Sequence, residues 1–443
     1  MAIMEFLLPL LFLFGLLWSI SKLRFFKNSP FSIRSLQFAF TVRVVMGFIL
    51  FLIYSKYYTV RQDADTFKYF DDSKYMYDAF WSHPLDYFQM LLGIDCNTEY
   101  FNTNYFDHMS NWVRSYDNGL FNDNRLVIRI NAFMRIFSFG NYHVHSLLLS
   151  YFAFLGSFSL AQVFYKVSKV KLASYFAVFL VPSVIFWSSG ILKEAVLLFA
   201  LGFFTYHVYE LSGRHKRLRS YAVLFLMSCI LIVMKLYVFV AFIPPVIAWL
   251  VISKWRRGLW VYFGVYLIFF ALATLIGEFD PRYDFVNLIV DKQKQFIGLA
   301  EFYQVNSGFA MQPLSYDIWA IVKAGPEGLI NVLTKPWPSE VNSILFIPPF
   351  VENTLILVLI FLSIVYRKSL SQKEWDFAIF CISFCFILFL VIGLTTPITG
   401  ALVRYKIPGI PFLLMAICIF ISQNKLPKFL SQSKLAKFIR ELI

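Results

Sequence analysis

Residues 38–72 read FAFTVRVVMGFILFLIYSKYYTVRQDADTFKYFDD. The first part, 38–58, is an apolar run, and a helix needs about 20 apolar residues to cross a bilayer. The remainder places carboxylates directly after that run. They are Asp63, Asp65, Asp71 and Asp72. This order predicts a membrane-spanning helix that ends in acidic groups at the membrane–water boundary.

The whole chain has the composition of an integral membrane protein. Of its 443 residues, 59% are hydrophobic and 15% are charged, and the mean hydropathy is +0.65. Soluble domains contain roughly 45–50% apolar and about 25% charged residues. The net charge is +14, but the basic residues lie in short segments between apolar runs, which is typical of membrane topology. We therefore expect a membrane as partner and no nucleic acid.

Apolar runs of helix length recur along the chain, so we predict a single transmembrane domain over residues 1–443. Its fold would be an all-α, polytopic transmembrane helical bundle of about 11 spans. The predicted spans are 5–20, 38–58, 143–165, 172–188, 192–211, 219–234, 237–253, 258–276, 346–366, 377–395 and 407–422.

Lys and Arg are concentrated in alternate connections between these runs, and the positive-inside rule assigns such connections to the cytoplasm. The basic segments are 21–37, 166–171, 212–218, 254–257, 367–376 and 423–443. The chain is therefore expected to begin outside the membrane and to end in the cytoplasm. Its basic amphipathic tail, 423–443, is expected to lie on the anionic inner leaflet.

Two long segments remain for the outer side, namely 59–142 and 277–345. In the first we expect helices at the membrane interface, such as 76–92 and 124–137. In the second, the sequence AGPEG at 324–328 predicts a turn.

The acidic cluster is the first candidate for chemistry. Asp63 and Asp65 are two residues apart, so in an extended stretch their side chains share a face. One would act as a general base, and the other would orient a sugar hydroxyl or hold a divalent cation such as Mg²⁺ or Mn²⁺. The alternative is a solvated linker without a catalytic role.

The second candidate is PSVIFWSSGILKEAV at 182–196. A turn at Ser188 and Ser189 would place hydroxyls and backbone N–H groups at a helix start, followed by Lys193 and Glu194. Such a combination suits a phosphate. The alternative is an internal Lys193–Glu194 ion pair in a structural hairpin.

The third candidate is TTPITGALVRYKIPGIPF at 395–412, which places Arg404 and Tyr405 at the outer end of the last span. Arg presents a planar fork of donors that matches a phosphate, and Tyr favours the headgroup level. The alternative is that both side chains are anchors at the membrane surface.

Other polar residues near the outer side are assigned secondary roles. Candidates for acceptor or secondary contacts are Asp71, Asp72, Glu194, Glu352 and Lys235. Glu352 is expected to pair with Lys235 or to contact substrate. Arg43, inside the second span, needs a partner or extends toward the interface. The remaining arginines considered, which would contact a phosphate or line a solvated helix face, are Arg125, Arg129 and Arg135.

These features resemble the GT-C superfamily of polytopic glycosyltransferases. The resemblance lies in DAD at 63–65, in RYKIPGIP at 404–411 and in the long first outer loop, and FWSSG at 186–190 is similar to a pattern in bacterial membrane proteins of this kind. One departure is the additional predicted helix that precedes the acidic motif.

The resemblance implies transfer of a sugar, with inversion, from a polyprenyl-phosphate-linked donor to a hydroxyl of a glycan, lipid or protein acceptor. It places the reaction at the outer face of a bacterial inner membrane, with Asp63 or Asp65 as general base. It implies donor-phosphate contacts by Arg404, Tyr405, Lys193, Ser188 and Ser189. No cofactor is required, a divalent cation at the two aspartates is optional, and we expect no resident metal site.

Two alternatives remain open. One is an O-antigen or exopolysaccharide polymerase that uses polyprenyl-diphosphate oligosaccharides. The other is a transporter or lipid flippase, which the mostly uncharged span centres disfavour.

Overall fold

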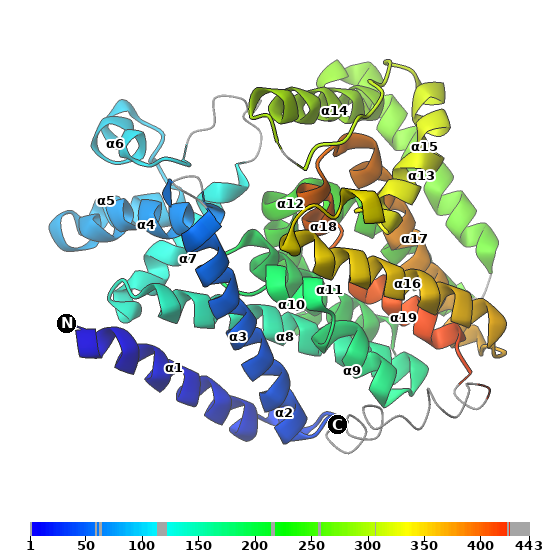
Figure 1. Ribbon diagram of the computed structural model, residues 1–443, viewed down its shortest axis with the longest axis horizontal. Helices are drawn as coiled ribbons and strands as arrows, with labels where there is room; N and C mark the ends of the chain where they lie inside the picture. The colour runs from blue at the N-terminus through cyan, green and yellow to red at the C-terminus, as the bar shows by residue number, and fades with distance from the viewer. Residues whose placement is uncertain are drawn as a thin grey trace.

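The computed structural model describes residues 2–57, 60–61, 64–112, 122–213, 218–255, 258–305, 307–422 and 425. Every regular element in these ranges is a helix (Figure 1), which confirms the predicted all-α class. Eight helices of this part of the chain are long and apolar enough to cross a membrane. They are α1 (Ala2–Lys22), α3 (Ile33–Tyr57), α8 (Tyr142–Ser168), α11 (Lys193–Ser212), α12 (Leu218–Trp255), α13 (Leu259–Phe279), α16 (Ile347–Val365) and α17 (Gln372–Thr395).

Two of the predicted spans are not single long helices. The run 172–188 is divided into α9 (Lys171–Phe179) and α10 (Pro182–Trp187), because Pro182 can begin a helix but cannot continue one. The last run belongs to a pair, α18 (Thr399–Tyr405) and α19 (Ile410–Phe420), that is bent by 66°. If this bent pair is one span, the described chain has up to nine.

The helix α12 contains a reversal of the chain at Lys235, whose backbone is not helical (φ −153°, ψ 82°). Ser220, near the start of α12, lies 3.2 Å from His207 at the C-terminal end of α11. Trp249, near the other end of α12, lies beside Tyr209 in the same part of α11, with ring centroids 6.3 Å apart. In a straight helix these two positions of α12 would be about 43 Å apart. Both halves of α12 therefore lie alongside α11.

The core of the bundle is held by close helix contacts and stacked rings. A Cβ on Gly156 of α8 would lie 2.3 Å from the carbonyl oxygen of Leu198 in α11, so only glycine permits this approach. Phe242 of α12 packs against rings of α17 and α19, with centroids 4.8 Å from Phe384 and 5.8 Å from Phe412. These contacts fix the helices whose ends form the candidate site.

The basic ends of several helices meet at one end of the bundle. Lys166 of α8 pairs with Glu210 of α11 at 2.8 Å, and Lys373 of α17 donates to the Tyr209 hydroxyl at 3.0 Å. Three of the segments that were predicted to be cytoplasmic thus begin or end close together. The tail 423–443 lies outside the described residues except for Lys425.

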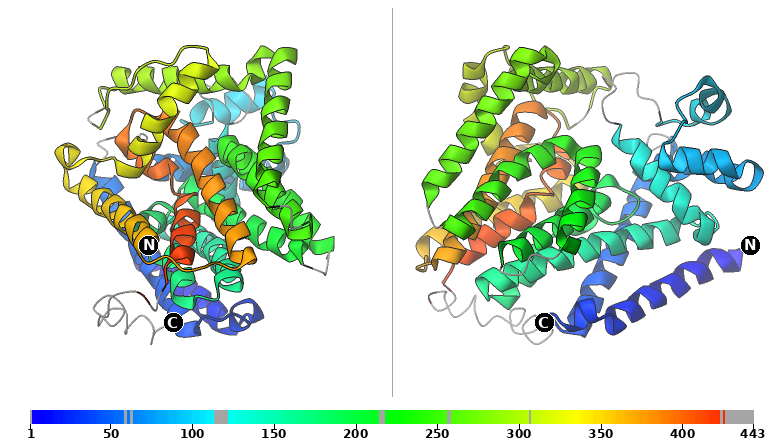
Figure 2. Two further views of the ribbon diagram at one scale, coloured as in Figure 1. Left: turned by 90° about the vertical axis from the view of Figure 1, so that its right-hand side faces the viewer. Right: turned by 180° about the vertical axis from the view of Figure 1, so that it is seen from behind.

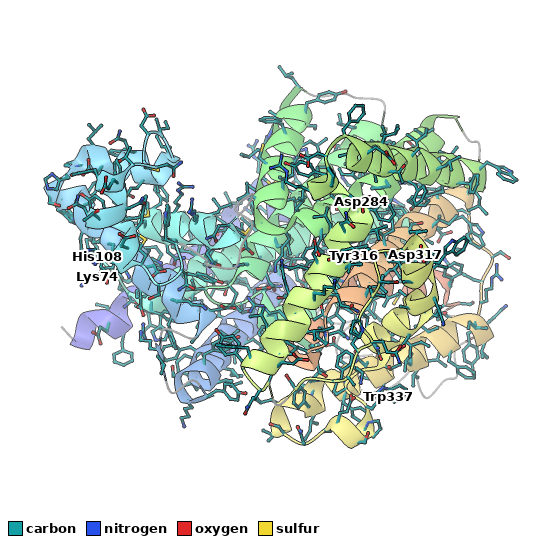
Figure 3. All side chains as sticks on the ribbon, turned by 90° about the horizontal axis from the view of Figure 1, so that it is seen from above. Lys74, His108, Asp284, Tyr316, Asp317 and Trp337 are labelled. Carbon is teal, nitrogen blue, oxygen red and sulfur yellow. The ribbon has the colours of Figure 1, made fainter. Side chains whose placement is uncertain are left out.

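The long loops form helices at the opposite end. These are α4 (Asp65–Ser82), α5 (Pro84–Leu92), α6 (Glu99–Asn104), α7 (Asp123–Ser138), α14 (Phe285–Phe302) and α15 (Ile318–Thr334). Both views in Figure 2 place α14 at the top of the bundle and the first-loop helices in the upper half. Seen from above (Figure 3), Lys74 and His108 of the first loop lie on one side and Tyr316 and Asp317 of the second on the other. The predicted turn at 324–328 is wrong, because these residues lie inside α15.

Candidate functional site

The ends of three helices meet at the end of the bundle that carries the loop helices. Asp65 is the first residue of α4, Glu194 is in the first turn of α11, and Arg404 is in the last turn of α18. Carboxylates are favoured at helix N-termini and cations at C-termini. Gly190 permits the turn before α11, because its φ of +77° is a conformation that other residues rarely adopt.

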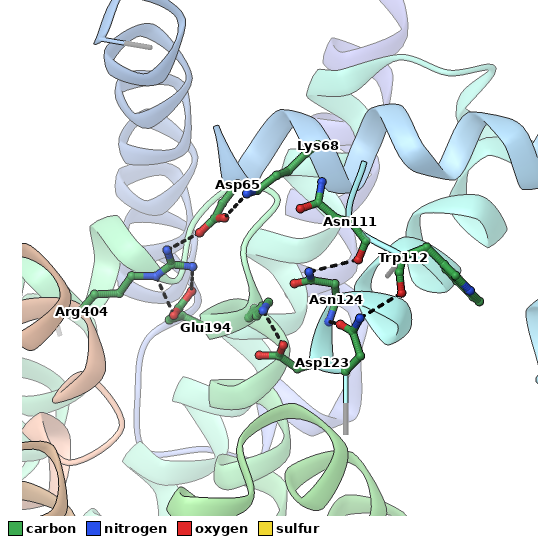
Figure 4. Close-up of polar contacts among 10 residues, drawn as sticks. Asp65, Lys68, Asn111, Trp112, Asp123, Asn124, Glu194 and Arg404 are labelled. Carbon is green, nitrogen blue, oxygen red and sulfur yellow. Dashed lines mark hydrogen bonds and ion pairs between the residues drawn. The ribbon is translucent and has the colours of Figure 1, made fainter. Parts of the chain in front are cut away.

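Arg404 joins the two carboxylates (Figure 4). Its Nε and Nη2 atoms donate to the two oxygens of Glu194 at 2.7 and 2.9 Å, and its Nη1 atom donates to Asp65 at 2.6 Å. The Glu194 side chain is 2% exposed, whereas that of Asp65 is 29% exposed. Glu194 therefore orients the guanidinium from inside, and Asp65 is the carboxylate on the accessible side.

The surroundings of Asp65 keep it ionised. Burial acts to raise its pKa, but the positive charges of Arg404, Lys68 and Lys193 outweigh burial and hold the pKa well below its usual range. Lys68, one helical turn further along α4, lies 3.3 Å from the second oxygen of Asp65. A general base works best when its pKa is near the working pH. While it remains paired, Asp65 is consequently a weak proton acceptor.

Lys193 and Glu194 do not pair with each other, although they are adjacent. The Lys193 ammonium contacts Asp123 at the start of α7 at 2.6 Å and faces the Tyr69 ring at 5.5 Å. Its side chain is 6% exposed. The turn before α11 therefore connects α7 to α18 through two ion pairs that point in different directions.

Aromatic side chains surround the basic group. Arg404 lies over the Trp187 ring, 5.4 Å from its centroid, and Tyr405 packs edge-on against Phe296 of α14 at 6.0 Å. Lys235, at the reversal of α12, is 4.6 Å from the Tyr405 ring and close enough to Glu194 for electrostatic interaction. The reversal thus brings a further cation to the same rim.

The described part of the cluster carries an excess of positive charge. Its cations are Arg404, Lys193, Lys68 and Lys235, and its carboxylates are Asp65, Glu194 and Asp123. Four positive and three negative groups leave one positive charge. Arg404 has five N–H groups, of which the two carboxylates occupy three. The arrangement can accept an anion without first losing either carboxylate.

The structure places Ser188 and Ser189 inside the bundle. Both are fully buried, the Ser189 hydroxyl donates to the carbonyl of Ile185 at 2.5 Å, and the Ser188 hydroxyl accepts from Arg43. Arg43 also donates to Ser157 at 3.1 Å. Ser188 and Ser157 therefore hold a buried arginine of α3, and the phosphate contact predicted for Ser188 and Ser189 is not visible in their geometry.

Glu352 and Lys235 lie in different surroundings and do not form the predicted pair. Glu352 accepts from the backbone N–H and the hydroxyl of Ser183 at 2.8 and 2.6 Å. Close by in sequence, Asn353 accepts from the buried Lys406 at 2.6 Å. The bond from Lys406 ties the break between α18 and α19, directly after Arg404, to α16.

Of the remaining acidic candidates, the described ones have partners outside the cluster. Asp72 accepts from the backbone N–H groups of Ser110 and Asn111, both at 2.9 Å, and burial raises its pKa. Asp71 forms an exposed ion pair with Arg61 at 2.7 Å. Asp63 lies outside the described residues. Asp72 therefore shapes the first loop, whereas Asp71 is at the surface.

The three arginines of the first loop bind backbone carbonyls. Arg125 donates to Trp112 at 3.0 Å, Arg129 to Met90 at 2.7 Å and Arg135 to Phe70 at 2.6 Å. The bond from Arg125 and one from Asn124 to the Asn111 carbonyl hold the start of α7. Figure 4 shows the second of these bonds beside Asp123. These residues position the loop.

Sequence reasoning overlooked Lys68, Asp123 and Trp187. Lys68 had a local signal, because it follows Asp65 by three residues and helical side chains at that spacing are neighbours. Asp123 had only a weak signal, a carboxylate at a helix start. Trp187 lies in the sequence FWSSG, and nothing in that sequence indicates its contact with Arg404.

A divalent cation shared by Asp63 and Asp65 stays a prediction, because Asp63 lies outside the described residues and only Asp65 can be described. Both carboxylate oxygens face cationic side chains, one toward Arg404 and the other toward Lys68. No group of three His, Cys, Asp or Glu side chains suited to a metal occurs among the residues that the structure describes.

Comparison of the chain with protein-family models, curated proteins and solved structures finds no match in any of the three. The fold and the site define a helical membrane protein with an arginine–carboxylate cluster at one end of its bundle.

Proposed function

We propose that the protein is a membrane glycosyltransferase that takes a sugar from a polyprenyl-phosphate-linked donor. In this proposal the cluster faces the outer side of a bacterial inner membrane, with the N-terminus outside and the C-terminus in the cytoplasm. The acceptor is a hydroxyl of a glycan, lipid or protein. The observation that carries the proposal is the position of Arg404 between Asp65 and Glu194 at the rim of an apolar bundle.

The two unoccupied N–H groups of Arg404 would bind the donor phosphate, while Glu194 keeps the guanidinium in place. A phosphate that shares Arg404 weakens its attraction for Asp65, so the pKa of Asp65 rises toward its ordinary value. Donor binding would in this way convert a paired carboxylate into a proton acceptor.

In the transfer step, the acceptor oxygen attacks the anomeric carbon and its proton passes to the Asp65 carboxylate. The bond between that carbon and the phosphate oxygen breaks, and its electron pair leaves with the polyprenyl phosphate. The extra negative charge on the phosphate is stabilised by Arg404 and by the neighbouring ammonium groups.

A polymerase acting on polyprenyl-diphosphate oligosaccharides is the second candidate. It is favoured by the number of cations, because Lys193 and Lys235 flank Arg404 and would match a second phosphate. Both candidates use the same rim and the same carboxylate.

The test is sugar transfer in proteoliposomes with two radiolabelled donors, a polyprenyl-monophosphate sugar and a polyprenyl-diphosphate oligosaccharide. General-base assistance is worth roughly 10²–10⁴-fold, so Asp65→Asn should reduce kcat by about that factor. Asp71→Asn is the matched control, since Asp71 is an exposed carboxylate of the same helix. Activity with the first donor supports the proposal, activity with the second alone selects the polymerase, and an unimpaired Asp65→Asn protein contradicts both.

A further inference from the structure

A hollow lies in the first loop, away from the arginine cluster. It has a volume of about 250 Å³ and is formed by the C-terminal half of α4, by His83 directly before α5, and by α6 with the residue after it. Its lining includes Tyr75, Asp78, Ser82, His83, Tyr100 and Asn104. This volume is below the roughly 300–1,000 Å³ of clefts for drug-sized ligands, which suits a single ring-sized group.

The hollow combines aromatic surface with hydrogen-bond acceptors. Tyr75 is 41% exposed and Tyr100 is 50% exposed, so parts of both rings are available to a ligand. The Ser82 hydroxyl and the Asn104 amide donate to backbone carbonyls, at 3.2 and 2.8 Å, and the oxygen of each side chain can still accept a hydrogen bond. The Asp78 carboxylate adds a charged acceptor.

Two tyrosines of the hollow are fixed by one carboxylate. The hydroxyls of Tyr100 and Tyr105 both donate to the same oxygen of Asp86, each at 2.8 Å. Asp86 thereby holds α6 against α5. A pre-organised wall reduces the entropy cost of binding.

These properties select the class of ligand. No Lys or Arg is among the described residues that line the hollow, which disfavours a phosphate. A saccharide ring has a C–H face that packs on an aromatic ring and several hydroxyl donors around its edge. The hollow has acceptors distributed around two tyrosine rings. A saccharide ring matches this arrangement better than a ligand with a single ammonium group does.

The position of the hollow indicates which part of a glycan it would hold. Asp65 begins α4, and Asp78 is thirteen residues further along the same helix, which corresponds to roughly 20 Å. A sugar in the hollow would therefore be several units away from the reacting one.

We propose that the hollow between α4 and α6 is a subsite for an uncharged saccharide unit, and that it binds a distal unit of a glycan acceptor. The acceptor role rests on the proposed transferase function, whereas saccharide binding itself does not.

The test is saturation-transfer NMR on the full-length protein in nanodiscs, with maltotetraose, cellotetraose and chitotetraose as probes. We expect transfer from protein to the ring protons of at least one probe, reduced at least fivefold in Tyr100→Ala and in Asp78→Ala. Ser82→Trp, which fills the hollow from an exposed position, should have the same effect. Trp81→Ala is the matched control, because Trp81 is an exposed aromatic residue of α4 outside the lining.

The outcomes separate this inference from the proposed function. Arg404→Gln should abolish sugar transfer and leave saccharide binding unchanged. The subsite would be overturned if none of the three probes shows saturation transfer from the protein. It would also be overturned if the hollow variants and the control give equal signals, or if tetramethylammonium displaces the signal. Saccharide binding by a protein that lacks transferase activity would retain the subsite and remove its acceptor role.

Discussion

At the scale of single residues, the account depends on how Glu194 and Asp65 share one arginine. Glu194 is buried and accepts two bonds from Arg404, so its replacement would leave a buried guanidinium partly unpaired. Breaking a buried pair costs about 3–5 kcal/mol, whereas an exposed pair contributes about 0–1 kcal/mol.

We therefore expect Glu194→Gln to lower the thermal unfolding temperature in detergent markedly. Glu210→Gln, which breaks a half-exposed pair with Lys166 at the other end, is the control and should change it little. Equal shifts in the two variants would show that Arg404 does not depend on Glu194.

The low pKa of Asp65 predicts the pH dependence. A carboxyl whose folded-state pKa is depressed contributes stability at pH values above its unfolded pKa of about 3.9, and this contribution is lost as the pH falls further. Titration of Asp65 should therefore leave unfolding unaffected between about pH 5 and 8. In Arg404→Gln the pKa of Asp65 rises, so the acid limb of a pH–stability profile should move to higher pH. If the acid limb stays at the same pH in this variant, Arg404 does not lower the pKa of Asp65.

Much of the site was accessible from sequence at this scale, because topology alone predicted that Asp65 and Arg404 share one rim. Their direct contact and the role of Glu194 were not accessible. Lys193 and Glu194 are neighbours in the chain, and only the packed positions of α7 and α18 show that one faces Asp123 and the other Arg404.

At the scale of elements, the crossing of α8 and α11 positions the helix that carries Glu194. A methyl group on Gly156 would overlap the backbone of Leu198, and overpacking typically costs 1–3 kcal/mol or more. Gly156→Ala should lower the unfolding temperature and the yield of folded protein. Gly264→Ala in α13 is the control, because a Cβ there meets nothing within 4 Å. Matching losses in both variants would contradict the close crossing.

The elements also show where apolar runs stop being informative. Hydropathy located most of the long helices, but it could not distinguish a spanning helix from the two short helices on either side of Pro182. The Gly and Pro residues of AGPEG suggested a turn at Gly325 and Pro326, where tertiary packing against α17 stabilises a continuous helix around the proline. Gly328 lies against Gly393 of α17, a contact that spacing in sequence cannot reveal.

At the scale of the whole molecule, the charge asymmetry has a structural counterpart. Lys166 and Lys373 lie at one end of the bundle, and the cluster around Arg404 lies at the other, together with the helices of both long loops. The alternation of basic segments was enough to predict which segments share an end. The arrangement of the loop helices depends on buried bonds such as those of Asp72, which no periodic pattern encodes.

The most direct test of the central claim is photolabelling of the full-length protein in proteoliposomes with a polyprenyl-phosphate analogue that carries a photoreactive group next to the phosphate. The account predicts labelled peptides that contain Trp187 and Tyr405, with loss of that labelling in Arg404→Gln. Labelling at the end that contains Lys166 and Lys373, or labelling unchanged by Arg404→Gln, would contradict it.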